Sequence, residues 1–224
     1  MSGMICVLTG DIVRSTELGD RKLDELMKAL AKESDRIRKW TQPASPRLER
    51  FRGDGWQLVL TDPTYALRAG LLLRATVKKV DQDADTRIAF GIGFGTLGSA
   101  LAESSGDAFE KSGVQLEKIK GQDRWAVDGD FESGHLLPLV RALFTVCEGL
   151  TSGWTSKQAD IFGRMGVPEK PKYGEVAKKL GVSPQTVQEH FARAGGRSLL
   201  RAIHGFEVAV GGISPNDLLS HKSG

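Results

Sequence analysis

The order of strand and helix patterns in the first 130 residues constrains the fold of this 224-residue chain more than any other feature. Short apolar runs and glycine-bounded arms indicate strands, whereas apolar residues spaced by three and four indicate amphipathic helices. The predicted elements are, in order, a strand at Met4 to Thr9, a helix at Glu17 to Trp40, two hairpin strands within Arg47 to Leu60, a helix at Pro63 to Val80, a strand in RIAFGIGFG, a helix at Gly106 to Lys120 and a strand in DRWAVDG. This order favours an α+β fold.

The pattern changes after Gly129, where helical spacing dominates the rest of the chain. We expect a connecting helix from Glu132 to Leu150, bent or begun afresh at Pro138. The stretch EVAVGGI is the next one with strand character. We therefore predict a sheet-containing domain over residues 1–131 and an all-α domain over residues 132–224.

Composition excludes some classes of protein. With 40% hydrophobic and 26% charged residues the chain is ordinary for a globular protein, and no apolar run approaches the roughly 20 residues of a membrane span. The start of the chain lacks a basic region followed by a long apolar one, so a cytoplasmic location without a membrane partner is expected. Cys6 and Cys147 have no metal-ligand spacing and are predicted to be reduced packing residues.

Two acidic residues follow predicted strands. Asp11 comes after the first strand, and Asp54 lies at the tip of the hairpin in Gly53-Asp54-Gly55. Such residues are usually turn formers or helix caps, and that structural interpretation remains the alternative. If the two strands are neighbours in one sheet, both carboxylates and an exposed backbone carbonyl make a hard-oxygen site suited to Mg²⁺, which usually arrives with a triphosphate.

The segments TGDIVRST and RFRGDGWQLVL resemble the two metal-binding segments of class III nucleotidyl cyclases. The resemblance implies a ferredoxin-like, cyclase-like sandwich in which Asp11, Asp54 and the carbonyl of Ile12 hold the metal. It also implies that Val13, Arg14, Ser15 and Thr16 hold phosphates, a use of backbone amides and hydroxyls at a helix start. Arg50 falls where adenylate-forming members carry a base-selecting lysine. Because a guanidinium differs in geometry from an ammonium, the resemblance does not fix which nucleotide base is bound.

The third cyclase segment departs from the family pattern. Aligning SGDAFEKSGVQLE by its glycine places Glu110 at the position of the asparagine that orients the ribose and Val114 at that of the arginine that stabilises the transition state. Losing such electrostatic groups costs orders of magnitude in rate, unless Lys111 or Lys118 substitutes. We therefore assign no catalytic residue and expect nucleotide binding without turnover.

The segment YGEVAKKLGVSPQTVQEHFARAG indicates two helices joined by a tight turn. Gly181 permits the turn, Ser183 caps the next helix and Pro184 suits its first position, while Val182 is expected to plug the core. The segment resembles the helix-turn-helix of sigma-factor region four, whose second helix enters the major groove of DNA. A helical hairpin used for packing or dimerisation is the alternative.

Residue types on and around the second helix match that function. The outward residues Gln185, Thr186, Gln188, Glu189 and His190 are types that read base edges. The basic residues Lys178, Lys179, Arg193 and Arg197 are expected to contact phosphates of double-stranded DNA. The net charge of +3 is small, but nine basic residues face four acidic ones between Trp154 and Arg201, so the basic excess lies toward the C-terminus.

Over nearly the whole chain, a degenerate cyclase-like half followed by WTSKQ and a helix-turn-helix is similar to the SatD-like bacterial proteins. Because the acidic pair is retained beside lost transition-state groups, we expect a DNA-binding transcriptional regulator with a nucleotide effector. A homodimer is expected because cyclase-like domains pair and helix-turn-helix proteins commonly read two half-sites. One alternative is an active nucleotidyl cyclase or another metal-dependent nucleotide-processing enzyme. The other is a constitutive DNA binder whose cyclase-like domain serves for dimerisation.

Overall fold

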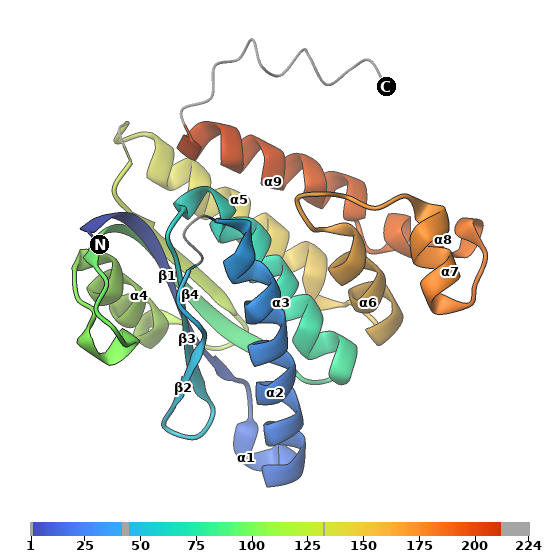
Figure 1. Ribbon diagram of the computed structural model, residues 1–224, viewed down its shortest axis with the longest axis horizontal. Coiled ribbons are helices and arrows are strands. Elements are labelled where there is room, and N and C mark those ends of the chain that lie inside the picture. The colour runs from blue at the N-terminus through green and yellow to red at the C-terminus, as the bar shows by residue number, and fades with distance from the viewer. Residues whose placement is uncertain (1, 42–44, 132, 212–224) are drawn as a thin grey trace.

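The computed structural model describes residues 2–41, 45–131 and 133–211 (Figure 1). Its centre is a five-stranded sheet with the order β2-β3-β1-β4-β5. The strands β4 and β5 run parallel because a helix connects them, and the other neighbouring pairs are antiparallel. The bounds are β1 (Ser2–Ile12), β2 (Glu49–Phe51), β3 (Gly55–Leu60), β4 (Thr86–Thr96) and β5 (Trp125–Gly129).

Helices cover both faces of this sheet. Figure 1 shows α2 (Asp20–Ile37) and α3 (Ala66–Val80) on one face and α4 (Asp107–Lys118) on the other. Short 3-10 turns occupy Pro63–Tyr65 and Leu101–Glu103. Because the observed element order is the one expected from the sequence, the predicted α+β sandwich is confirmed.

The helix expected from Glu17 to Trp40 is divided. A short helix, α1 (Ser15–Leu18), ends at Gly19, whose φ of 75° lies in the region that favours glycine. The long helix α2 then begins, and a 3-10 turn at Arg38–Trp40 follows it. The break places Ser15 and Thr16 in the short helix α1, beside the end of β1.

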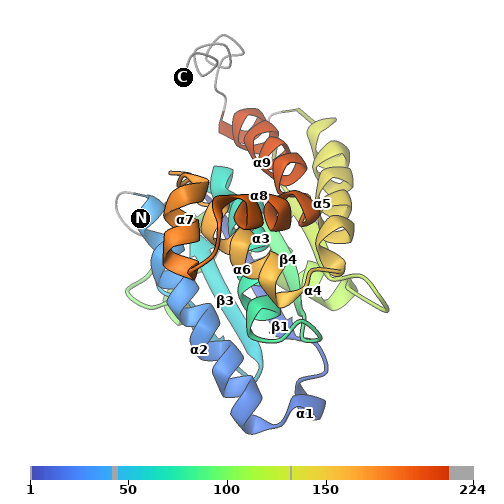
Figure 2. The ribbon, with the colours of Figure 1, turned by 90° about the vertical axis from the view of Figure 1, so that its right-hand side faces the viewer.

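Five helices make up the rest of the described chain: α5 (Leu136–Ser152), α6 (Ser156–Met165), α7 (Tyr173–Leu180), α8 (Pro184–Arg193) and α9 (Gly196–Gly211). They pack on the α3 side of the sheet (Figure 2). Pro138 lies in the first turn of α5, where proline is tolerated. The ring of Phe144 lies 4.9 Å from that of Phe90 in β4 and 5.3 Å from that of Phe206 in α9, so the sheet and the helices share one apolar core.

Two local expectations are wrong. The described part of EVAVGGI, Glu207 to Gly211, ends α9 instead of forming a strand, because buried residues at helical spacing (Leu199, Ile203 and Phe206) fix this segment as a helix; its last two residues lie outside the described ranges. Val182 is 42% exposed and does not plug the core.

Cys6 and Cys147 are buried free thiols, as predicted, and burial raises the pKa of the Cys147 thiol to about 11. In the described ranges we find no helix with the length and apolar character that a bilayer crossing requires.

Candidate functional sites

A cavity of about 290 Å³ lies where β1 ends. The end of β1, the start of α1, the tip of the β2–β3 hairpin, the start of β4 and the loop between α4 and β5 form its walls. The lining residues are Ile12, Val13, Arg14, Ser15, Thr16, Asp54, Arg87, Ile119, Lys120, Gly121, Asp123 and Arg124. Six of the eight residues predicted for nucleotide binding therefore lie together around one cavity.

Asp11 and Arg87 form an ion pair beside this cavity. The two residues are cross-strand neighbours in the β1–β4 ladder, and Nε of Arg87 donates to Oδ1 of Asp11 at 2.8 Å while Nη2 donates to Oδ2. The hydrogen bond to Asp11 raises the pKa of Arg87, and the negative charge of Asp54 acts in the same direction. Both predicted acidic residues thus act on one guanidinium.

Asp54 is held by a hydroxyl of the first turn of α1. Oγ of Ser15 donates to Oδ2 of Asp54 at 2.5 Å. In the β1–β3 ladder Asp11 faces Gly55, the residue that follows Asp54, so the sheet brings the two acids to the same edge as expected.

Arg50 lies outside the cavity lining. Its Nη1 donates to Oδ1 of Asp24 in α2 at 2.6 Å, and its Nε donates to the carbonyl of Gly53. The guanidinium therefore braces the hairpin against α2.

The two carboxylates predicted to hold Mg²⁺ are engaged by other groups of the chain. Both carboxylate oxygens of Asp11 accept hydrogen bonds from Arg87, and Asp54 accepts one from Ser15. Within the described residues, no three His, Cys, Asp or Glu side chains are grouped so as to hold a metal ion. The cation beside Asp11 is the guanidinium of the chain itself.

The third cyclase segment lies on α4. Glu110 and Val114 are both exposed on this helix. Lys111 is engaged by Asp107 and Asp130, with both Nζ–Oδ2 distances at 2.6 Å. This lysine is therefore already paired with two carboxylates.

Sequence reasoning missed four charged residues of the cavity: Arg87, Lys120, Asp123 and Arg124. The charged turn KGQDR before the last strand was the available signal for three of them. Arg87 is recognisable only once the register of β1 on β4 is known. With Arg14 and Asp54, these residues give the cavity four cationic and two acidic side chains.

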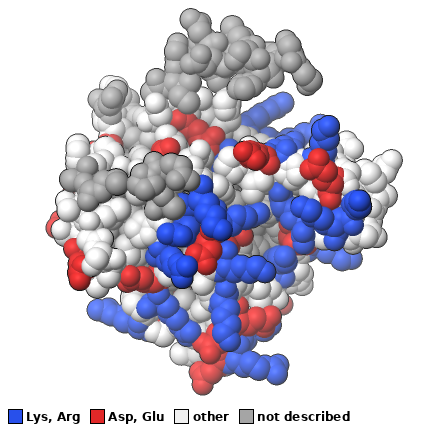
Figure 3. Space-filling view, in the orientation of Figure 1, with Lys and Arg blue, Asp and Glu red and all other residues white. Residues whose placement is uncertain are grey.

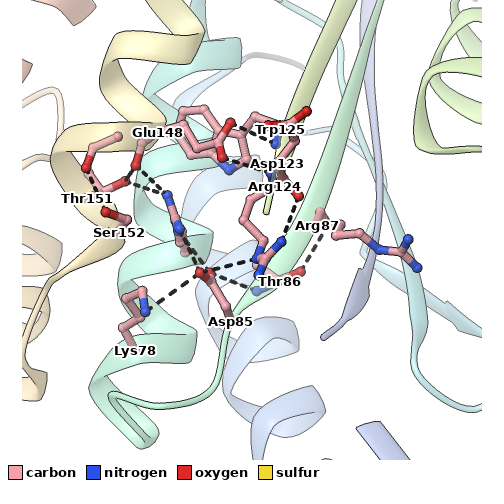
Figure 4. A network of polar contacts seen from close by, with 12 residues as sticks. Lys78, Asp85, Thr86, Arg87, Asp123, Arg124, Trp125, Glu148, Thr151 and Ser152 are labelled. Carbon is pink, nitrogen blue, oxygen red and sulfur yellow. Dashed lines mark hydrogen bonds and ion pairs between the residues drawn. The ribbon is translucent and has the colours of Figure 1, made fainter. Parts of the chain in front are cut away.

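A buried polar network lies behind the cavity (Figure 4). Arg74 of α3 pairs with both carboxylate oxygens of Asp85, and its Nη1 donates to the carbonyl of Glu148 and to Oγ1 of Thr151 in α5, both at 2.8 Å. The carboxylate of Glu148 accepts the backbone N–H groups of Arg124 at 2.8 Å and Trp125 at 3.1 Å. Burial raises the pKa of Glu148. Arg124 thus belongs to the cavity and to the network that holds α5.

The segment predicted to be a helix-turn-helix folds into the two helices α7 and α8, which pack on α6. Gly181 has a φ of 68°, Oγ of Ser183 accepts the N–H of Thr186 at 3.1 Å, and Pro184 begins α8. Leu180 is half-buried, and five further apolar side chains of this segment are buried: Val176, Ala177, Val187, Phe191 and Ala194. The rings of Trp154 and Phe162 lie 4.8 Å apart beneath them.

The outward face of α8 is polar. Gln185 and Gln188 are exposed, whereas Thr186 is half-buried and engaged with the cap, and His190 is half-buried. Glu189 accepts a hydrogen bond from Arg193 at 2.6 Å on the helix surface. Within the described part of the chain, Lys178, Lys179 and Arg197 form no ion pair. Figure 3 shows Lys and Arg side chains spread over the face that carries α2 and α7, with acidic residues between them.

Comparisons with known proteins find similar solved structures, but no protein-family model and no curated sequence matches. The active GGEEF domain of a diguanylate cyclase from Vibrio cholerae is 19% identical with a TM-score of 0.40, over 55% of this chain and 82% of that chain. The guanylyl cyclase Cya2 is 15% identical with a TM-score of 0.38, over 54% of this chain and 73% of that chain. Similarity at this level says nothing about the activity or ligand of this chain.

Proposed function

We propose that this protein is a DNA-binding transcriptional regulator whose sheet domain binds a nucleotide. The observation that carries the proposal is the capped turn between α7 and α8, with exposed glutamines on α8 and unpaired basic side chains around it. A helical hairpin that served packing alone would need neither this turn chemistry nor an exposed polar second helix.

In this proposal, different residues contact the bases and the phosphates of the DNA. Gln185 and Gln188 contact base edges, with adenine as the favoured partner of glutamine. Lys178, Lys179 and Arg197 contact phosphates, which supplies affinity without sequence information. Arg193 also contacts phosphate once its ion pair with Glu189 is broken. Ser183 contributes indirectly, because its side chain caps the start of α8.

The test is selection of bound duplexes from a random pool, followed by anisotropy titration of the selected duplex. We expect Gln188→Ala to change the preferred base at one position. We expect Lys178→Ala to weaken binding to every sequence and to lower the salt slope by about one. Lys28→Ala, an exposed lysine of α2, is the matched control. Unchanged DNA affinity and unchanged base preference in both Gln188→Ala and Lys178→Ala would overturn the proposal that this protein binds DNA.

The cavity supplies the nucleotide site. Four cationic side chains and the hydroxyls of Ser15 and Thr16 suit a phosphate group. A volume of about 290 Å³ is near the lower end of the range for small-molecule sites, so it holds the phosphate end of a nucleotide and leaves the base outside. The guanidinium of Arg87 neutralises Asp11, so the anion meets a net positive wall without a metal.

Calorimetry with linear, cyclic and dinucleotides, and with inorganic pyrophosphate, tests this site. We expect binding in the presence of EDTA and its loss in Lys120→Ala, whereas Arg50→Ala, a substitution outside the cavity, keeps it. Absence of binding to all probes would favour the sheet domain as a dimerisation module. No described contact favours the active cyclase, and formation of cyclic product that vanished in Asp54→Ala would establish it.

The buried network gives the nucleotide a route to the DNA-binding helices. A ligand that contacts Arg124 acts on the residue whose backbone N–H donates to the carboxylate of Glu148 in α5. Helix α5 is followed by Gly153 and then by α6. Regulation requires that the ligand favours one arrangement of these elements over another, because equal affinity for both shifts nothing.

A further inference from the structure

One face of α5 is apolar and exposed. Leu139, Val146 and Leu150 are 66%, 59% and 48% exposed, and half-buried Leu143 lies between them. Their spacing of four, three and four residues places all four side chains on one stripe of the helix. Three exposed large apolar residues in one line differ from the singly scattered ones of an ordinary surface.

The stripe carries no charge. Arg141 and Glu148 are the charged residues of α5, and both are held by β5 and the residue before it. Arg141 donates to the carbonyl of Val127 and to Oδ1 of Asp128, both at 3.1 Å. Glu148 accepts the backbone N–H groups of Arg124 and Trp125. A partner of this face therefore needs apolar side chains and no complementary charge.

The stripe is symmetric about its own centre. The positions 139, 143, 146 and 150 read the same in both directions around the midpoint between Phe144 and Thr145. A two-fold axis at this midpoint sets Leu139 against Leu150 of the other copy and Leu143 against Val146, in both directions at once. This is the self-complementarity that an isologous interface requires.

We propose that α5 pairs antiparallel with α5 of a second copy of this chain. Figure 2 shows α5 at one side of the molecule, with α9 beside it and no described element on its outer side. The exposed small residues Ala142 and Gly149 lie next to the stripe and let the two helices approach closely. The pairing fixes the separation of the two helix-turn-helix units, because α5 leads directly into α6. It stands independently of whether DNA or a nucleotide is bound.

Sedimentation equilibrium of the full chain tests the pairing. We expect a dimer for the wild type, and a dissociation constant at least about a hundredfold higher for Val146→Glu, because each buried carboxylate would lack a partner. Phe94→Glu on β4 is the matched control, since Phe94 is 61% exposed and lies outside α5. Circular dichroism should show both variants folded. A monomeric wild type, or a dimer that Phe94→Glu disrupts and Val146→Glu leaves intact, would overturn the proposal.

Cysteine cross-linking tests the direction. In one helix positions 139 and 150 lie about 16 Å apart, so the double variant Leu139→Cys/Leu150→Cys cannot close a disulfide within its own helix. Antiparallel pairing predicts a disulfide-linked dimer of the double variant and little linkage of either single variant. Parallel pairing would link each single variant to itself and would contradict the proposal. The native Cys6 and Cys147 are buried.

Discussion

The guanidinium of Arg87 donates two hydrogen bonds to the carboxylate of Asp11 across the β1–β4 ladder. The pair gives the acidic residue at the end of β1 a cationic partner within the chain.

The variant Arg87→Ala tests whether the cation that serves this site is the guanidinium of Arg87 or a metal ion. We expect weak Mg²⁺ binding by the wild type and tighter Mg²⁺ binding by Arg87→Ala, because Asp11 becomes free. Nucleotide affinity in EDTA should fall roughly tenfold or more in the same variant, since a charge-assisted hydrogen bond contributes about 1.5–3 kcal/mol. Calorimetry measures both, with Arg50→Ala as control. Tight Mg²⁺ binding by the wild type would contradict this account.

Arg74 is expected to be the side chain of the buried network on which stability depends most. It is 1% exposed and donates to Asp85, Glu148 and Thr151. Arg74→Met leaves Asp85 without its closest partner, which costs roughly 3–5 kcal/mol in the free energy of unfolding. Urea denaturation measures the loss. Arg193→Met, which breaks the exposed pair with Glu189, should change stability by less than about 0.5 kcal/mol.

A double variant checks that the Arg74 effect belongs to the pair. Adding Asp85→Asn to Arg74→Met should cost less than the sum of the two single changes, because both single changes break the same ion pair. Additive losses would show that Arg74 acts through packing instead.

Local patterns predicted the elements of this fold, and long-range register limited the prediction of its sites. The β2–β3 hairpin and the α7–α8 turn were predictable because Gly53-Asp54-Gly55 and Gly181 to Pro184 specify their own geometry. The contact of Arg87 with Asp11 joins residues 76 positions apart, and a shift of one residue in the ladder would turn Arg87 to the other face. Arg124 and Lys120 reach the cavity only because β5 is placed beside β4.

Single residues were mispredicted where two local rules compete. The apolar character of Val182 favoured a core position, but the sharp turn at Gly181 points this side chain toward solvent. Gly19 interrupts a pattern that is otherwise helical from Glu17 onward, because its positive φ redirects the chain. In EVAVGGI the β-branched residues suggested a strand. The segment is helical instead, because α9 packs on the apolar core.

The exposure of Val182 has a measurable consequence. Val182→Ala should change the free energy of unfolding by less than about 0.5 kcal/mol, as for an ordinary surface position. The fully buried Val187 in α8 is its matched partner, and Val187→Ala should cost roughly 2 kcal/mol from lost burial and the cavity left behind. Thermal denaturation of both variants measures the difference; equal losses would place Val182 in the core after all.

Glu148 should make stability depend on pH. Because its pKa is raised in the folded protein, the folded state holds the proton more tightly than the unfolded chain does. Its contribution is therefore most favourable below the ordinary value of 4.5 and is lost as the pH rises through the raised pKa. Urea denaturation at a series of pH values, for the wild type and Glu148→Gln, isolates this contribution. The wild type should lose stability relative to the variant as the pH rises, and an opposite trend would contradict the burial argument.

The most direct test of the account is the affinity for one selected duplex, measured with and without a saturating nucleotide from the calorimetric panel. We predict a change within the range of about 5–150-fold that is typical of coupled sites, in either direction. The change should disappear in Arg124→Ala, which keeps α7 and α8 and removes a side chain that lines the cavity and pairs with Asp85 of the buried network at 3.8 Å. Identical DNA affinity with and without bound nucleotide would contradict the proposal that the sheet domain regulates DNA binding.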